Sequence, residues 1–116
     1  MNYEVYLPYI NVAEGMKRMA NNKALFGRLL KMCQESAEFQ LFEDAAAAGD
    51  TVAAGNVTHA IKGMCGNLSM TRLFETSGSL CQSLRTGVWD EQRLADYREA
   101  VSKTIETLPA LLAELA

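Results

Sequence analysis

Residues 55–68 read GNVTHAIKGMCGNL and contain the only histidine of the chain, His59. Successive residues of an α-helix turn by about 100°, so offsets of −4, +4 and +7 return to nearly the same face. These offsets carry Gly55, Gly63 and Gly66, which place the histidine on a strip with almost no side-chain cover. We therefore predict a helix that exposes its imidazole.

The apolar side chains of this segment lie on its other side. Val57, Ile61, Met64 and Leu68 project roughly 140–200° away from His59 around the helix axis. Because the apolar face is the one that packs, this geometry argues against a histidine buried in the core. The imidazole is then free to act on something outside the domain.

The glycines near the histidine require a physical reason, because glycine inside a helix costs about 0.5–1 kcal/mol relative to alanine. Either a neighbouring helix of the same domain crosses closely there, or a partner protein must approach the imidazole. We expect Gly66 to serve packing and Gly63 to serve partner access. Near neutral pH an imidazole is largely a neutral nucleophile that can accept and release a phosphoryl group. Lys62 adds an ammonium one turn away.

Helix boundaries in the rest of the chain follow from capping residues, glycines and proline. Ser36 marks either a break or a bend, and Gly49 and Gly87 end helices. Pro109 is expected to kink or end the last helix near Leu108, because it lacks a backbone donor. The predicted N-caps are Asn11, Asn22, Asp50 and Asp90, with Ser69 or Thr71 for the helix that follows the histidine helix.

Apolar residues recur at three- and four-residue intervals throughout, and no strand pattern competes with them. We predict an all-α fold, namely an up-and-down antiparallel four-helix bundle with an additional short N-terminal helix or helices. Residues 1–116 form a single domain, in which residues 1–10 lead into a core of residues 11–116. The expected stripes of the last two helices are Leu73, Phe74, Leu80 and Leu84, then Leu94, Tyr97, Val101, Ile105, Leu108 and Leu112.

Composition narrows the classes of function. The chain has 116 residues and a net charge of −3 without a basic run, which argues against nucleic acid or an anionic membrane as partner. No run of about 18 apolar residues and no signal peptide pattern is present. The widely spaced Cys33, Cys65 and Cys81 indicate free thiols. We expect a cytoplasmic monomer.

The run HAIKG at residues 59–63, continued by Asn67, Leu68 and Leu73, resembles the histidine phosphotransfer (HPt) domain family. That family shows a His-x-x-Lys-Gly core, an Asn-Leu-Gly-type helix end and a leucine that begins the next helical stripe. This chain departs from the pattern at Ser69, where the family commonly has glycine. The resemblance covers roughly residues 11–110, because the predicted helices fall where that family has them.

The resemblance implies that His59 exchanges a phosphoryl group with the aspartyl phosphate of a response-regulator receiver domain, or with a hybrid sensor histidine kinase. Lys62 would hold the phosphoryl group electrostatically, and Gly63 would give the partner room. Such a carrier has no ATP-dependent kinase activity and no cofactor, because Mg²⁺ belongs to the receiver. Cys81 stands where that family often has Glu or Gln to bond the imidazole, and Gln82 follows it.

Two other classes of function stay open. His59 and the cysteines would make a metal or redox site, although Cys65 lies about 240° around the helix and no zinc-type cysteine pairing occurs. Alternatively, the domain is a helical adaptor that binds receiver domains or partner helices without carrying phosphate. His59 would then be only a contact residue.

Overall fold

The computed structural model describes residues 2–116, and every regular element within them is helical, which confirms the all-α fold class. None of these helices combines the length and the apolar composition needed to cross a bilayer. The elements are a 3₁₀ helix η1 (Tyr3–Tyr6) and the helices α1 (Val12–Arg18), α2 (Lys23–Gln34), α3 (Glu38–Ala47), α4 (Thr51–Asn67), α5 (Thr71–Arg85) and α6 (Glu91–Leu115).

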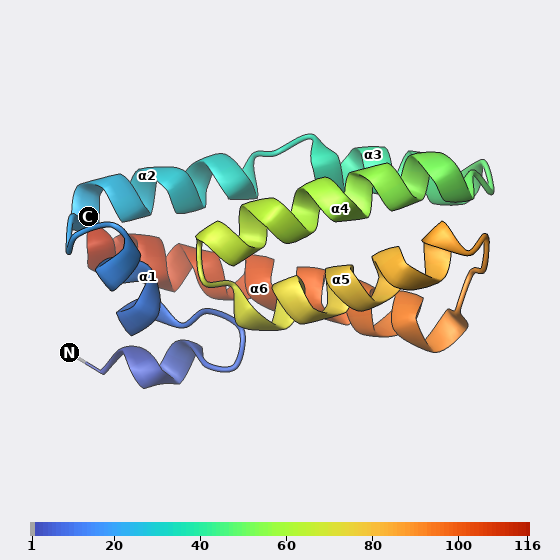
Figure 1. Cartoon of the computed structure of the whole chain (residues 1–116). Coiled ribbons are helices and arrows are strands. Elements are labelled where there is room, and N and C mark those ends of the chain that lie inside the picture. The colour runs from blue at the N-terminus through green and yellow to red at the C-terminus, as the bar shows by residue number, and fades with distance from the viewer. Residues whose placement is uncertain (1) are drawn as a thin grey trace.

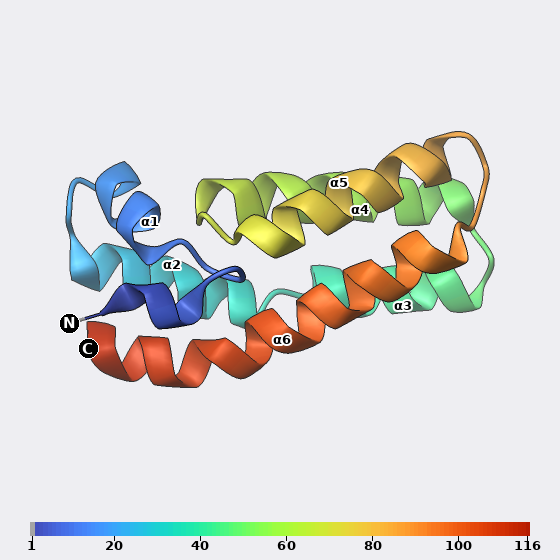
Figure 2. The same ribbon diagram turned by 90° about the horizontal axis from the view of Figure 1, so that it is seen from below.

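The long helices lie side by side along one axis (Figure 1), and the molecule measures 43 × 22 × 21 Å. Helices α2 and α3 follow each other along one side. Helix α4 packs against α3 and α5, α5 also packs against α6, and α6 packs against α2. Figure 2 shows that η1 and the last turns of α6 lie at the same end of the molecule.

The four predicted N-caps of α1, α2, α4 and α6 are confirmed. Each side chain accepts a hydrogen bond from the backbone amide three residues further on, at 2.9–3.1 Å, which satisfies a donor that the helix leaves free. The four residues are Asn11, Asn22, Asp50 and Asp90.

The predicted helix ends hold as well. Gly49 and Gly87 have φ angles of +67° and +79°, the left-handed conformation that glycine adopts without a steric penalty. At Ser36 the chain breaks rather than bends, because α2 ends at Gln34 and α3 begins at Glu38. The Ser36 hydroxyl accepts a hydrogen bond from the Glu38 amide at 3.2 Å and so helps to start α3.

The predicted caps of α5 are wrong. Met70 occupies the N-cap position, and no side chain there bonds the first amides. Ser69 instead has a φ of +55°, and its hydroxyl donates to the Glu14 carboxylate at 2.9 Å, so its oxygen is used to tie α1 to the α4–α5 connection. The amide of Asn11 donates to the Ser69 carbonyl at 2.8 Å and closes the same junction.

Pro109 does not end the last helix, which continues to Leu115. A proline inside a helix costs about 3 kcal/mol, and apolar burial offsets this cost. Leu108, Leu111 and Leu115 are all buried beyond or beside the proline, so the C-terminal turns stay helical. Of the two outcomes predicted for Pro109, an end of the helix near Leu108 is therefore incorrect.

The N-terminal lead places most of its apolar side chains against the core. Tyr6 and Ile10 are buried, and Tyr3 packs against the core while half-buried. Leu7, the C-cap residue of η1, is 47% exposed. The largest fully buried members of the core cluster include Phe26, Leu30, Phe42, Ile61, Leu73, Leu80, Tyr97, Leu108 and Leu111.

The apolar face predicted for α4 does pack inward. Ile61 and Leu68 are buried, and Val57 and Met64 are half-buried against the core. Thr58 shares this face and is fully buried, with its hydroxyl donating to two carbonyls of its own helix at 2.9 and 3.0 Å. The polar group therefore needs no partner from another helix.

Gly15 of α1 is the tightest glycine of the fold. A Cβ built on it would lie 2.4 Å from Phe26 Cζ, and Phe26 is fully buried. We expect Gly15→Ala to lower the free energy of unfolding by about 1–3 kcal/mol through overpacking, measured by urea denaturation. An unchanged or increased stability would show that α1 is not held against α2 as described.

Tyr97 gives the fold a dependence on alkaline pH. It is 1% exposed, its ring centroid lies 4.7 Å from that of Phe42, and burial together with the Glu43 carboxylate raises the pKa of Tyr97. An unfolded tyrosine ionises near pH 10, so stability is complete below that pH and falls as pH rises toward the higher pKa of the folded state.

We expect Tyr97→Phe to reduce this alkaline loss by about 1 kcal/mol between pH 10 and 11. The measurement is urea denaturation at several pH values, followed by the fluorescence of Trp89, the only tryptophan. If the variant lost stability as steeply as the wild type, Tyr97 would not be the group responsible.

Candidate functional site

His59 is exposed in the middle of α4, as the helix geometry predicts. Its imidazole makes no hydrogen bond and no ion pair with any other part of residues 2–116. Ile61 and Thr58, both fully buried, anchor this part of α4 to the core and so fix the position of His59. The ring nitrogens are thus available to a reactant that comes from solvent.

A surface hollow of about 190 Å³ lies beside this imidazole, between α4 and α5. We call it the His59 hollow. Its lining contains nitrogen-bearing and small side chains and no carboxylate, although acidic residues outnumber basic ones in the whole chain, 14 to 11. Its lining residues are His59, Lys62, Gly78, Cys81, Gln82 and Arg85.

The two cations of the His59 hollow have no counter-ion. Neither Lys62 nor Arg85 takes part in any of the ion pairs within residues 2–116. Uncompensated positive charge around a nucleophile favours an anionic reactant, because the ion–ion attraction is not already satisfied inside the protein. The site is therefore suited to chemistry on a phosphate or a carboxylate.

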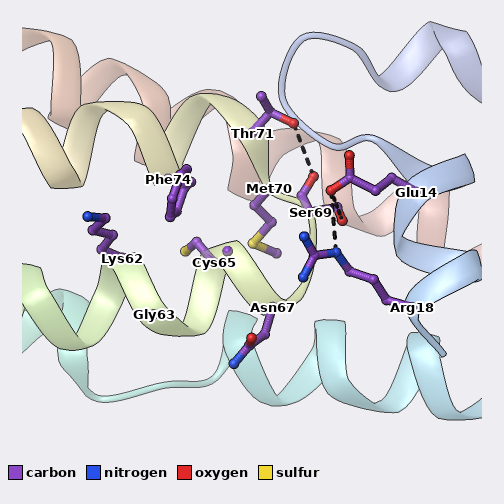
Figure 3. Close-up of a pocket in the computed structure, with 11 residues that line it drawn as sticks. Glu14, Arg18, Lys62, Gly63, Cys65, Asn67, Ser69, Met70, Thr71 and Phe74 are labelled. Atoms are coloured by element: carbon purple, nitrogen blue, oxygen red, sulfur yellow. Dashed lines mark hydrogen bonds and ion pairs between the residues drawn. The ribbon is translucent and has the colours of Figure 1, made fainter.

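Lys62 reaches across to α5 rather than out into solvent. The bare Gly78 makes room for its stem, since a Cβ built on Gly78 would lie 3.3 Å from Lys62 Cδ. The Lys62 ammonium nitrogen lies 5.5 Å from the centroid of the Phe74 ring, within the range of a cation–π contact. Figure 3 shows the two side chains next to each other, one from each helix.

A second pocket of about 390 Å³, drawn in Figure 3, shares Lys62 with the lining of the His59 hollow. We call it the adjoining pocket. Its other cation, Arg18, is paired with Glu14 at 3.4 Å, so its charge is compensated. Its apolar wall includes Phe74 and Met70. Lys62 is thus the only cation that lines both cavities within the described residues.

The three glycines of the predicted strip differ in their surroundings. Gly63 is exposed, and a Cβ built on it would meet nothing within 4 Å, so the face beside His59 is open to an incoming molecule. Gly66 serves packing, because a Cβ there would lie 3.0 Å from two carbons of the Phe74 ring. Gly55, predicted on the exposed strip, is buried instead.

The burial of Gly55 comes from α5. A Cβ built on this glycine would lie 3.7 Å from Leu84 Cβ, and the Gly55 carbonyl accepts a hydrogen bond from the Cys81 thiol at 3.5 Å. Helix α5 therefore crosses α4 closely one turn before His59. The exposed strip begins only at the histidine.

Neither candidate for orienting the imidazole holds it in this structure. Cys81 is buried and bonds the backbone of α4, while Gln82 is exposed at the rim of the His59 hollow. Among the side-chain hydrogen bonds of residues 2–116, none joins His59 to either residue. The amide of Gln82 is the nearer match, in chemical type, to the group that the resemblance implies.

Sequence reasoning missed the contribution of α5 to the site. Phe74, assigned to the buried stripe, is 40% exposed and faces the adjoining pocket, while Gly78 and Arg85 received no role. The signal was present, because residues 74, 78, 82 and 85 recur at intervals of four, four and three and so share one face of a helix. The sequence alone did not tell which neighbour that face meets.

Of the three cysteines, only Cys81 lines the His59 hollow. All three are buried and free, and the Cys33 thiol donates to the Met70 thioether at 3.7 Å. The neighbouring Cys33 thiol and burial together raise the pKa of the Cys65 thiol, so it stays protonated. No group of three or more His, Cys, Asp or Glu side chains that could hold a metal occurs in the described part of the chain.

No protein-family model, curated protein or solved structure matches this chain. Its function therefore has to follow from the residues of the site: an exposed and unbonded imidazole, two unpaired cations and an open glycine beside them.

Proposed function

We propose that the protein is a histidine phosphotransfer carrier that accepts a phosphoryl group on His59 from the aspartyl phosphate of a response-regulator receiver domain and can return it. The observation that carries this proposal is the exposed imidazole in a hollow with two cations, Lys62 and Arg85, and no carboxylate. Phosphoryl transfer depends mainly on positioning and on charge stabilisation, and this hollow offers both.

In the proposed step a lone pair on one imidazole nitrogen forms the N–P bond. The P–O bond to the receiver's aspartate breaks, and that carboxylate leaves with the electron pair, while the other ring nitrogen of His59 keeps its proton. Lys62 and Arg85 attract the phosphoryl oxygens electrostatically. Mg²⁺ acts in the receiver's acidic pocket, so the carrier itself needs no cofactor and no ATP-dependent kinase activity.

The arrangement of helices supports the same proposal. We assign it to an up-and-down antiparallel four-helix bundle, in which α2 and α3 together form one column and α4, α5 and α6 form the other three. The helices η1 and α1 are then the additional N-terminal ones. Such a rigid bundle holds the imidazole on a fixed helix while a partner docks over Gly63.

The proposed partner is a receiver domain, either free or within a hybrid sensor histidine kinase, and the carrier acts as a monomer in the cytoplasm. The test is to mix the protein with receiver domains of the source organism that carry a labelled aspartyl phosphate. Rapid movement of the label to this chain is the expected result. Stable binding without any transfer would instead identify an adaptor, and transfer from no receiver would reject the proposal.

A further inference from the structure

Within the described residues, Lys62 is the only cationic side chain that lines both the His59 hollow and the adjoining pocket. Its ammonium nitrogen lies over the Phe74 ring, on the side of the adjoining pocket. The residue expected to hold the phosphoryl group on His59 therefore also contacts an aromatic ring of its own protein.

Two bare glycines create this contact. Gly66 leaves room for the Phe74 ring, because a Cβ there would lie 3.0 Å from ring carbons Cδ2 and Cε2. Gly78 leaves room for the Lys62 stem, whose Cδ and Cε would lie 3.3 and 3.4 Å from an added Cβ. The packing against these two glycines holds both side chains in place. Their contact is therefore part of the fold rather than a chance approach of two surface groups.

We propose that Phe74 is a positioning residue that holds the Lys62 ammonium over its ring while His59 is unmodified and thereby lowers the equilibrium share of phosphoryl group carried by this protein. This inference rests on the proposed phosphotransfer function. On this proposal a phosphoryl group on His59 attracts the Lys62 ammonium, and the ammonium leaves the ring to meet it. By linkage, a contact made only in the unmodified state favours that state.

The expected size follows from the strength of an exposed cation–π contact, which corresponds to about a two- to fivefold change in an equilibrium constant. Phe74 is 40% exposed, which places the contact in that weaker range. A change of this size would have little effect on the stability of the fold. It is measurable as a change in how a phosphoryl group distributes between two proteins that exchange it reversibly.

The test compares Phe74→Leu with Phe74→Tyr in a mixture with a phosphorylated receiver at equilibrium. Leucine keeps apolar bulk on Gly66 but has no ring face, whereas tyrosine keeps the ring face. We expect Phe74→Leu to raise the ratio of phosphorylated carrier to phosphorylated receiver about two- to fivefold, and Phe74→Tyr to leave it at the wild-type value. Equal shifts in both variants, or no shift in either, would overturn the inference.

A double-mutant cycle assigns the effect to the ammonium. In a Lys62→Met background, Phe74→Leu should no longer change the equilibrium, because no cation is left for the ring to hold. An effect of the same size in that background would show that Phe74 acts through packing, and the inference would be wrong.

The contact also has a readout that needs no receiver. Ring current from Phe74 should shift the Lys62 Cε protons upfield in NMR spectra, and phosphorylation of His59 by phosphoramidate should reduce that shift. A persistent upfield shift after phosphorylation would overturn the inference while receiver transfer still supported the function. Absence of transfer from every receiver would reject the function, and the proposed role of Phe74 would fall with it.

Discussion

Replacement of His59 by glutamine is expected to abolish phosphoryl acceptance from a receiver domain. Glutamine keeps a polar side chain of similar reach, but its amide nitrogen has no available lone pair to attack phosphorus. Because His59 is exposed and makes no side-chain hydrogen bond within residues 2–116, the change should alter the free energy of unfolding by no more than about 0.5 kcal/mol.

This prediction separates chemistry from folding. The measurement follows labelled phosphate from a receiver to the variant, while circular dichroism and urea denaturation check that the helices are intact. Arg85→Gln is a useful companion, since it removes a cation from the His59 hollow but keeps the nucleophile, so it should slow transfer without abolishing it. Transfer that survives in His59→Gln would refute the assignment of the acceptor.

Substitution of Gly63 by glutamine is expected to slow transfer by at least about tenfold while making the helix more stable. Nothing lies within 4 Å of a Cβ at this position, so the new side chain fits the fold but projects into the space beside the imidazole. A misplacement of reacting groups by about 1 Å can cost about a hundredfold in rate. Glutamine is also a better helix former than glycine by about 0.5 kcal/mol.

The two effects have opposite signs, which makes the experiment decisive. Ala113→Gln is the matched control, because it adds the same side chain to an exposed position of α6, away from the His59 hollow. That variant should transfer phosphate at the wild-type rate. If Gly63→Gln transferred phosphate as fast as Ala113→Gln, the open face of α4 would not be the approach route of the partner.

Features decided within a few residues could be predicted from the sequence. The caps at Asn11, Asn22, Asp50 and Asp90 act on amides three residues along the same helix, so no tertiary information is needed. The same holds for the exposure of His59, which depends only on where the apolar residues of its own helix point.

Features decided between helices could not be predicted in this way. Gly55 is buried because α5 crosses there, and Pro109 is tolerated because leucines around it pack inward. Phe74 has an apolar side chain next to the buried stripe of α5, yet it lies at the surface against Gly66. The apolar pattern of a helix indicates which side chains the helix can bury. The helices that pack against it determine which of those side chains are buried in the fold.

The decisive measurement for His59 as the phosphoryl carrier is to incubate the protein with a receiver domain that bears labelled aspartyl phosphate and then to locate the label. We expect one labelled group per chain, lost in acid and retained in alkali, on the peptide that contains His59. Label that resists acid, that maps to another residue, or that never reaches this chain would show that His59 is not the carrier.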